Sequence, residues 1–334
     1  MVNKIRLFTG NSNPELAQEV ADCLTVPLTK AKVQKFIDGE TYVKILEPVR
    51  GDDVFVIQPT SHPANEHIME LLIMLDALRR ASPKRITAVI PFYGYARQDR
   101  KATSREPITA RLVADLLTAV GTDRVLAVDL HADQIQGFFN IPLDHLTAVP
   151  IILNYYFTQD LKNTVVVAPD EGSVKSNSSL ARKLGLPLVI IHKSRSKTAV
   201  DSFDDFTVLG SVKGKNVIIL DDEINTAGTI SNAVKMLKDK GAKRISIAAT
   251  HAVFAGPAVE RLRKAPVDEV IVTNTIRIPP EKKFPKLKVL SMAPMIAEAI
   301  RRIHEERSMG TIFDEMTNRE LGLKVNKKLD LFYV

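Results

Sequence analysis

The chain of 334 residues lacks tryptophan and contains a single cysteine, Cys23. One cysteine excludes an internal disulfide framework and predicts a reducing, cytoplasmic location. No uninterrupted apolar run reaches about 18 residues, so we expect no membrane span. The N-terminus leads directly into a strand-like run and does not have the pattern of a signal peptide. Aromatic residues make up 6% of the chain, which argues against stacking platforms for single-stranded nucleic acid.

The formal net charge is +7, which leaves two classes of anionic partner open. A basic protein can bind nucleic acid. The cations are spread along the chain, however, with small concentrations at 193–197 and 282–288 and no long basic run. Anionic small molecules such as nucleotides explain the charge about as well. We therefore favour phosphate-containing small molecules as ligands and expect no nucleic acid.

Apolar strand-like runs alternate with helical patterns along most of the chain. This alternation predicts an α/β fold with mainly parallel sheets. The length suggests about two domains, and the pattern restarts near residue 149 with similar alternation. We divide the chain into an N-terminal domain at 1–147, a C-terminal domain at 148–318 and a tail at 319–334, to which we assign no structure.

Three segments stand out from this alternation. Extended runs at 31–36 and 41–46 are separated by an Asp-Gly pair at 38–39, which is typical of a hairpin. Residues 92–106 form a long loop rich in cations and aromatic residues, and such loops usually bind ligands. Another long loop is expected from residue 192 to about residue 206.

The stretch at 217–232 carries the strongest functional pattern. Its first four residues, 217–220, are apolar and predict a buried strand. A short loop then leads to a helical pattern at 230–240. Strand, loop and helix in this order gather free backbone N–H groups at the helix N-terminus, where they suit a phosphate group. The alternative is an ordinary strand-to-helix turn with acidic surface residues.

Residues inside this loop narrow the expected ligand. Gly228 lets the backbone approach a ligand closely, and Thr226 and Thr229 add hydroxyl donors. Asp221 and Asp222 follow the strand directly, and carboxylates accept hydrogen bonds from the paired hydroxyls of a polyol. A phosphate beside a diol is a sugar phosphate, and a ribose phosphate fits in size.

Six strings together resemble the ribose-phosphate pyrophosphokinases, the synthetases of phosphoribosyl pyrophosphate. They are Phe-Ile-Asp-Gly-Glu at 36–40, Tyr-Ala-Arg-Gln-Asp at 95–99, Asp-Leu-His-Ala at 129–132, Gln-Ile-Gln-Gly-Phe-Phe at 134–139, His-Lys-x-Arg at 192–195, and the loop at 221–229. The last alone suits any type I phosphoribosyltransferase, whereas the whole set in this order indicates the pyrophosphokinase. The resemblance implies an α/β fold of two duplicated type I phosphoribosyltransferase-like domains with mainly parallel sheets.

The resemblance also implies a reaction. The diphosphate group of ATP is transferred to the 1-hydroxyl of ribose 5-phosphate, giving phosphoribosyl pyrophosphate and AMP. Such a transfer requires Mg2+ and cations that offset the charge of the triphosphate. It also requires an oriented ribose and the exclusion of water. A homo-oligomer, as a hexamer, is expected on the same ground.

The resemblance assigns ATP binding to two segments. They are the hairpin residues Phe36, Asp38, Gly39 and Glu40, and the loop residues Arg97 and Gln98. Phe36 would stack on adenine, with the two hairpin carboxylates at the edge of the base. In the family this hairpin reaches the ATP site of a neighbouring subunit. For Phe36 alone, a core aromatic is the alternative.

The remaining site residues are implied in the same way. His131 and Asp170 match the magnesium positions of the family, although a lone histidine is more often structural. Lys193 and Arg195 match the cations of a loop that closes over the phosphates, the alternative being a solvated charged run. Ribose 5-phosphate binding is assigned to Arg195, Asp221, Asp222, Asn225, Thr226, Ala227, Gly228 and Thr229.

Two departures from the family pattern concern activity. Asn225 stands where these synthetases usually carry Asp, which removes a negative charge near the ribose. Glu171 and Ser173 make the turn at 170–173 bulkier and more acidic than the glycine-rich turn of the family. The proposed metal residues and loop cations are retained, so we predict an active enzyme. The alternatives are a non-catalytic regulatory subunit and a phosphoribosyltransferase that acts on a base.

A second anion site, which in many relatives accepts activating phosphate or inhibitory ADP at a subunit interface, also differs. The family uses a Ser-Val-Arg string and a Ser-Val-Ser string. Here these strings read Pro-Val-Arg at 48–50 and Ser-Met-Gly at 308–310, so two hydroxyl donors are missing. We therefore predict weak activation by phosphate, and ADP inhibition that is mainly competitive with ATP.

Overall fold

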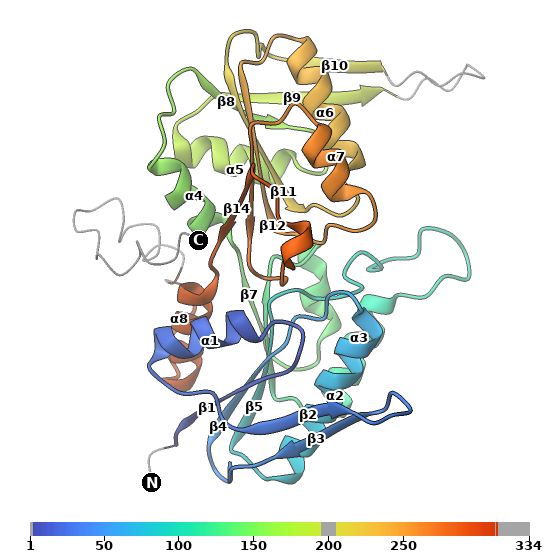
Figure 1. Ribbon diagram of the computed structural model, residues 1–334, viewed down its shortest axis with the longest axis vertical. Coiled ribbons are helices and arrows are strands. Elements are labelled where there is room, and N and C mark those ends of the chain that lie inside the picture. The colour runs from blue at the N-terminus through green and yellow to red at the C-terminus, as the bar shows by residue number, and fades with distance from the viewer. Residues whose placement is uncertain (1–2, 195–204, 311, 313–334) are drawn as a thin grey trace. The chain divides into compact units, whose positions relative to one another are not determined.

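A computed structural model describes residues 3–194, 205–310 and 312, with the backbone alone described at 192–194 and 205–208 (Figure 1). The chain forms two compact units. The first contains the described residues of 3–148, 274–277 and those from 291 onward, and the second contains those of 149–273 and 278–290. Each unit has its own sheet, so each is described by itself.

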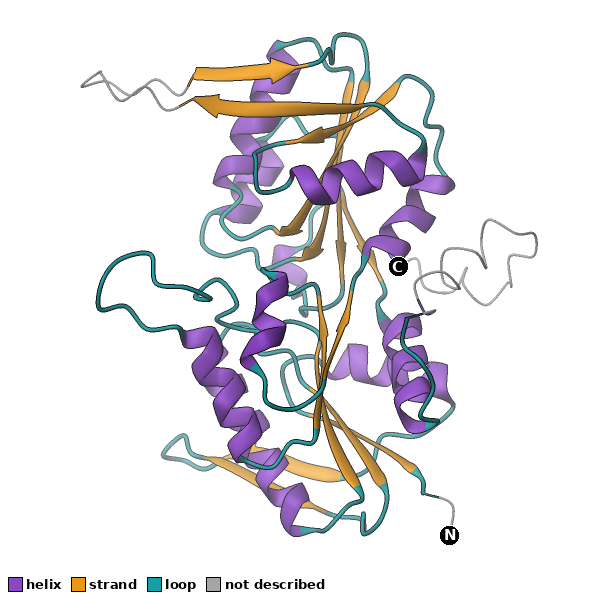
Figure 2. Cartoon of the chain, turned by 180° about the vertical axis from the view of Figure 1, so that it is seen from behind, coloured by secondary structure: helices purple, strands orange, loops and turns teal. Residues whose placement is uncertain are grey.

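The first unit is built on a sheet of five parallel strands in the order β1-β4-β5-β6-β7. These strands are β1 (Ile5–Thr9), β4 (Asp53–Ile57), β5 (Arg85–Ile90), β6 (Arg124–Val128) and β7 (Leu143–Leu146). A separate antiparallel hairpin forms as predicted from β2 (Ala31–Lys35) and β3 (Thr41–Ile45). Helices α2 (Ala64–Arg80) and α3 (Thr109–Ala119) cover one face of the sheet, and α1 (Pro14–Leu24) and α8 (Ala293–His304) cover the other (Figures 1 and 2). The 3-10 helix η1 (Asp133–Phe138) follows β6.

The second unit has a sheet of seven strands in the order β10-β9-β8-β11-β12-β13-β14, in which only the β10–β9 pair is antiparallel. The strands are β8 (Thr164–Ala168), β9 (Leu188–Ser194), β10 (Asp205–Leu209), β11 (Asn216–Glu223), β12 (Arg244–His251), β13 (Glu269–Thr273) and β14 (Leu287–Leu290). Helices α4 (Val149–Phe157) and α5 (Val174–Leu184) lie on one face, and α6 (Gly228–Asp239) and α7 (Ala258–Lys264) on the other (Figure 2). A short 3-10 helix, η2 (Pro280–Lys282), precedes β14.

The two units repeat one order of elements. A first strand, β1 or β8, is followed by a helix and by an antiparallel hairpin, β2–β3 or β9–β10. The next strand, β4 or β11, pairs with the first strand, and the later strands add outward in chain order. The predicted α/β class with mainly parallel sheets is therefore confirmed, and β4 and β11 occupy the same place in their units.

Helix α8 corrects the domain division made from the sequence. Residues 148–318 were expected to form the second domain, but α8 packs against α1 in the first unit. The guanidinium of Arg85 adds a hydrogen bond of 2.8 Å to the carbonyl of Ile303. An amphipathic pattern shows that a helix face is buried, but it does not show which sheet the face covers.

The segment at 192–206 corrects a second expectation. We expected a long loop, whereas its two described ends are strands, since β9 continues to Ser194 and pairs with β10 in an antiparallel arrangement; residues 195–204 of the expected loop lie outside the described residues. Lys193 therefore lies on a strand, with Phe206 as its backbone partner. The run at 205–209, Asp-Phe-Thr-Val-Leu, is rich in residues that favour strands, so the sequence did contain a signal for β10 that our expectation of a loop overlooked.

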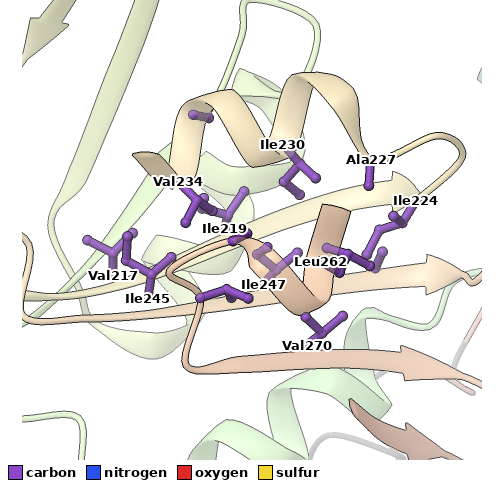
Figure 3. Close-up of a cluster of buried hydrophobic side chains, with 14 of the residues drawn as sticks. Val217, Ile219, Ile224, Ala227, Ile230, Val234, Ile245, Ile247, Leu262 and Val270 are labelled. Carbon is purple, nitrogen blue, oxygen red and sulfur yellow. The ribbon is translucent and has the colours of Figure 1, made fainter. Parts of the chain in front are cut away.

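The core of the second unit supports the loop that follows β11. Ile219 and Ile247 from the sheet pack with Val234 of α6, and Figure 3 shows these side chains meeting between sheet and helix. Fully burying such an aliphatic side chain is worth about 1.5–3 kcal/mol. Ile224 and Ala227 within the loop belong to the same buried cluster. The loop is thus anchored in the core at two points.

Candidate functional site

The loop between β11 and α6 presents an ordered set of backbone groups. The carbonyl of Ile224 accepts from the N–H of Phe254 at 2.9 Å, and that of Asn225 accepts from Ala255 at 3.0 Å. The carbonyl of Thr226 accepts from Nη1 of Arg261 at 2.9 Å. Within the described part of the chain, no acceptor is found for the N–H groups of 225–229. Carbonyls that are bonded and amides that are open make a site for an anion.

Ala227 fixes the shape of this loop. It adopts the left-handed conformation, with φ of 57°, at the N-cap position of α6. Gly228 follows, and a Cβ atom there would lie 3.2 Å from Nη1 of Arg261, a tight contact. We expected Gly228 to let the backbone approach a ligand, and in the structure it also leaves room for the guanidinium of Arg261. Thr226 and Thr229 are exposed beside the open amides.

Three carboxyl groups gather at the carboxyl ends of β8 and β11. Oδ1 of Asp221 accepts from the N–H of Asp222 at 2.9 Å. Burial, together with the negative charges of Asp222 and Asp170, raises the pKa of Asp221 to about 8. Burial disfavours the charged form of an acid, and neighbouring like charges do the same. A cation or a set of hydroxyl donors would therefore stabilise this cluster.

Asn177 on α5 joins the two strand ends that carry these acids. Its side chain is fully buried; Nδ2 donates to the carbonyl of Leu220 at 2.7 Å and Oδ1 accepts from the N–H of Leu220 at 2.9 Å. Nδ2 also donates to the carbonyl of Ser173 at 2.9 Å, and the N–H of Ser173 donates to Oδ1 of Asp170 at 2.9 Å. Asn177 thus connects the turn of Asp170 to the strand that leads to Asp221.

The position of Asn177 explains why the strands separate there. β8 and β11 pair only as far as Val166 and Ile218, whereas β8 and β9 continue to pair through Ala168. Sequence reasoning missed Asn177. The available signal was a polar residue one turn before the apolar Leu180 of the same helix.

The turn at 170–173 carries Glu171 and Ser173, which we expected to make it bulkier and more acidic than the turn of the family. The hydroxyl of Ser173 donates to the carbonyl of Asp170 at 3.0 Å, so Ser173 closes the turn on itself. Glu171 is exposed. Oδ2 of Asp170 has no partner among the residues described, which leaves one carboxylate oxygen for a ligand.

In the first unit, the hairpin between β2 and β3 exposes its tip. Phe36 is 50% exposed and packs edge-on against Tyr42 at 5.4 Å between ring centroids, which excludes the core-aromatic alternative. The turn is closed by the N–H of Phe36, which donates to the carbonyl of Glu40 at 2.8 Å. Gly39 has φ of 93°, which glycine adopts readily. Asp38 accepts from the N–H of Glu40 at 3.1 Å, so its side chain also shapes the tip.

The two candidate ATP-binding residues of the loop at 92–106, Arg97 and Gln98, have different surroundings. Arg97 is exposed. Oε1 of Gln98 accepts from the hydroxyl of Thr109 at 2.5 Å, and its carbonyl accepts from the N–H of Ala110 at 3.1 Å. Gln98 therefore holds the first turn of α3, where Ile108 at the N-cap offers no side-chain acceptor.

His131 follows β6 in a turn that its neighbours hold in place. Asp129 has φ of 33°, and its Oδ2 accepts from the N–H of Ala148 at 2.8 Å. The N–H of Leu130 donates to Nε2 of His145 at 2.9 Å. The imidazole of His131 is exposed at the carboxyl end of its strand.

The structure therefore brings together some predicted residues and not others. In the second unit, Asp170 and the loop at 221–229 share the carboxyl edge of the sheet. Lys193 lies on β9 with only its backbone described, and Arg195 lies outside the described residues. His131 and Asp170 belong to different units, and no group of three or more metal-binding side chains is found among the residues described. No helix in the described ranges is both long and apolar enough to span a membrane.

Comparisons with known proteins agree with one another. Residues 5–121 match the profile of the N-terminal domain of ribose phosphate pyrophosphokinase, and residues 198–314 match that of the phosphoribosyl synthetase-associated domain. The chain is 54% identical over 312 residues to the ribose-phosphate pyrophosphokinase of Caldanaerobacter subterraneus subsp. tengcongensis, covering 93% of this chain and 98% of the relative. It is 51% identical over 309 residues to the enzyme of the same name from Bacillus subtilis, covering 92% and 97%.

A solved structure gives the same result in three dimensions. The crystal structure of phosphoribosylpyrophosphate synthetase from Mycobacterium smegmatis matches with a TM-score of 0.86 at 49% identity. The match covers 91% of this chain and 100% of that chain. Likeness therefore extends over both units.

Proposed function

We infer that this chain, which belongs to the ribose-phosphate pyrophosphokinase family, transfers the diphosphate group of ATP to the 1-hydroxyl of ribose 5-phosphate. The products are phosphoribosyl pyrophosphate and AMP. The observation that carries the inference is the row of open N–H groups at 225–229 beside the carboxyl groups of Asp221 and Asp222. One part suits a phosphate group and the other suits a diol.

Ribose 5-phosphate is the ligand we propose for this loop. The open amides and the hydroxyls of Thr226 and Thr229 would bind the 5-phosphate, and the N-terminus of α6 would add its dipole. Asp221 and Asp222 would accept hydrogen bonds from the 2- and 3-hydroxyls. Asn225 keeps a polar side chain at the rim without adding charge to a cluster in which the pKa of Asp221 is already raised to about 8. This supports an active enzyme despite the departure from Asp.

The transfer then needs the 1-hydroxyl in line with the β-phosphorus. The hydroxyl oxygen attacks the β-phosphorus and loses its proton, the bond to the oxygen between the α- and β-phosphorus breaks, and AMP leaves with that oxygen. We propose that Lys193 and Arg195 stabilise the negative charge on the transferred group. The position of Lys193 on β9, the strand next to β8, supports this role for Lys193.

Magnesium is the cofactor we propose, held by Asp170 and His131. The open oxygen of Asp170 is the kind of ligand that Mg2+ prefers, whereas an imidazole would act through water. When bound, Mg2+ would offset the charge of the triphosphate. The raised pKa of Asp221, caused in part by Asp170, supports a cation in this acidic cluster.

ATP would bind through two segments of the first unit. We propose that the exposed ring of Phe36 stacks on adenine, with Asp38 and Glu40 at its edge, and that Arg97 contacts the base or the triphosphate. A half-exposed ring on a projecting hairpin is well suited to reach a neighbouring subunit. On this ground we propose a homo-oligomer, a hexamer by resemblance. We also propose a cytoplasmic location for the protein. The proposed use of ATP as a substrate and the bacterial relatives support it.

One assay separates the proposal from its alternatives. Purified protein is incubated with ATP, Mg2+ and ribose 5-phosphate, and AMP and phosphoribosyl pyrophosphate are expected in equal amounts. Omitting ribose 5-phosphate should abolish AMP formation. A folded protein that forms no AMP would be a non-catalytic subunit, and one that needs a base and phosphoribosyl pyrophosphate would be a phosphoribosyltransferase.

The assignment of Asp221 is tested in the same assay. Asp221→Ala removes an acceptor for the ribose hydroxyls and should raise KM for ribose 5-phosphate about 10-fold or more, because a hydrogen bond to a charged group is worth about 1.5–3 kcal/mol. KM for ATP should change little. Equal increases in both constants would point to a fold defect instead.

A further inference from the structure

The side chain of Arg261 contacts the backbone of the loop at 221–229. Arg261 lies on α7, 35 residues after Thr226, and its Nη1 donates to the carbonyl of Thr226 at 2.9 Å. The two preceding carbonyls of the loop, those of Ile224 and Asn225, are bound by backbone N–H groups instead. Arg261 is therefore the one side chain, within the described residues, that donates to the carbonyls of 224–226.

The geometry of the peptide bond gives this contact a consequence. In a trans peptide the C=O and the following N–H point in opposite directions. A donor that fixes the carbonyl of Thr226 therefore also aims the N–H of Ala227 to the opposite side. The same reasoning applies to the carbonyls of Ile224 and Asn225, which aim the next two amides. Three consecutive N–H groups, those of 225–227, are thus oriented by three bonds, and the last bond depends on Arg261.

Two features indicate that the shape of the loop depends most on the third bond, from Arg261 to the carbonyl of Thr226. Ala227 has φ of 57°, a conformation that residues with a Cβ atom seldom adopt without support. Gly228 also leaves the guanidinium room, because a Cβ at that position would lie 3.2 Å from Nη1 of Arg261. The cation therefore flanks the peptide group whose orientation matters, and its charge lies beside the row of open amides.

We propose that Arg261 is a positioning residue for ribose 5-phosphate, which orients the N–H of Ala227 toward the 5-phosphate. The proposal rests on the assignment of the loop to ribose 5-phosphate made above. Arg261 acts through the loop backbone, so its loss should weaken binding of the phosphorylated sugar and leave ATP binding and the transfer step largely unchanged.

The chain supplies a matched control on the same helix. Arg263 is also exposed, and its Nη2 donates to a backbone carbonyl, that of Lys283, at 2.9 Å. Arg263 thus has the same charge, the same helix and the same kind of bond as Arg261, but its bond goes to a segment preceding β14. A purely structural role in supporting α7 predicts similar effects for the two residues.

The experiment compares Arg261→Met, Arg261→Lys and Arg263→Met by steady-state kinetics with ribose 5-phosphate varied at saturating ATP. Arg261→Met should raise KM for ribose 5-phosphate about 10-fold, the scale of one lost hydrogen bond to a charged group. KM for ATP, kcat and the melting temperature should stay close to those of the parent. Arg261→Lys keeps the charge and a donor and should restore part of the loss. Arg263→Met should match the parent.

A loop variant distinguishes failure of this proposal from failure of the assignment beneath it. Thr229→Ala removes a hydroxyl donor from the loop itself. If it raises KM for ribose 5-phosphate while Arg261→Met does not, the role of Arg261 is overturned and the assignment of the loop stands. If neither change alters that KM, both are overturned. A fall in kcat together with a rise in both KM values for Arg261→Met would show a structural role and would also overturn the proposal.

Discussion

The loops after β4 and β11 occupy the same place in the two units, yet only the first is bound through Thr60 to the segment after β5, so we call the first unit closed and the second unit open. After β4, the hydroxyl of Thr60 accepts from the N–H of Gly94 at 2.7 Å, and the N–H of Thr60 donates to the carbonyl of Phe92 at 2.9 Å. Both Gln58 and Thr60 are fully buried. After β11, the N–H groups of 225–229 have no acceptor in the described ranges. The two copies of the loop thus differ in their backbone N–H groups, which supports our proposal of an anion site in the second copy.

A buried carboxylate explains how the first unit closes this edge. Glu70 of α2 accepts from the N–H of Asn11 and from its Nδ2, each at 2.7 Å, and from Nε2 of Gln58 at 2.8 Å. Asn11 lies directly after β1, the counterpart of β8. Glu70 therefore satisfies donors of Asn11 and Gln58 with an internal anion, whereas we propose a ligand for the amides at the corresponding edge of the second unit.

The largest effect is expected from the hairpin of the open unit. Lys193→Ala on β9 should lower kcat by about 10²–10³ with little change in ATP binding, the scale of losing one electrostatic donor at a reacting group. Lys32→Ala on β2, in the corresponding hairpin of the closed unit, is the control and should stay within about twofold of the parent, since Lys32 is an exposed charge to which we assign no contact with a substrate. Steady-state kinetics measures both. If kcat of the Lys193→Ala variant stayed within threefold of the parent value, Lys193 would not stabilise charge on the transferred group.

The next effect concerns the crowded carboxyls of the open unit. The pKa of Asp221 is raised to about 8, above its value in the unfolded chain, so the folded protein without ligand binds an extra proton between about pH 4 and pH 8. The free energy of unfolding therefore decreases as pH rises through this window, because Asp221 must lose its proton in the folded protein. Asp221→Asn should remove that decrease and stabilise the protein relative to the parent by about 2–3 kcal/mol more at pH 7 than at pH 5. Denaturant melts in the absence of Mg2+ and substrates would measure it, and a difference independent of pH would contradict the shift.

The closed unit should respond to the opposite change. Glu70→Gln replaces the internal anion with an amide that cannot accept from all three donors, so it should destabilise the fold by about 1–3 kcal/mol. Thermal or urea melts measure the loss. KM for ribose 5-phosphate should not change, because the loop that we propose for this substrate belongs to the second unit. If that KM rose as strongly as it does for loop variants of the second unit, the contrast between the units would be wrong.

The smallest effect is expected at the second anion site of the family. Arg50 is exposed and the hydroxyl of Ser308 accepts from the N–H of Gly310 at 3.3 Å, so Arg50 and the O–H of Ser308 remain as donors while Pro48 and Gly310 lack the hydroxyls of the family strings. Inorganic phosphate should change kcat by less than about twofold, since two lost hydrogen bonds to a charged oxygen weaken binding by 10²-fold or more. ADP should compete with ATP. Inhibition by ADP that persists at saturating ATP, together with strong dependence on phosphate, would show that the site works.

Features whose interacting residues are close together in the sequence could be predicted, whereas contacts between residues far apart in the sequence could not. The alternation of strands and helices and the hairpin at 31–45 are local patterns, and both were predicted correctly. The loop at 221–229 was recognisable because its amides, hydroxyls and carboxyls are neighbours in the chain. Asn177 and Arg261 act on residues 43 and 35 positions away. Periodicity reports which face of an element is buried, and it carries no information on such partners.

Asn177 also has a consequence for how the sheet accommodates an opening. A carboxamide presents its carbonyl oxygen and one of its two N–H groups on the same side, as an extended residue of a neighbouring strand does, so its pair of bonds to Leu220 imitates one rung of a strand ladder. β8 can therefore end its pairing with β11 at Ile218 without leaving the backbone of Leu220 unsatisfied. The side chain acts as a spacer of fixed length. A longer amide would shift the rung and an aliphatic residue would delete it, so the separation of the two strand ends is set by a single amino acid.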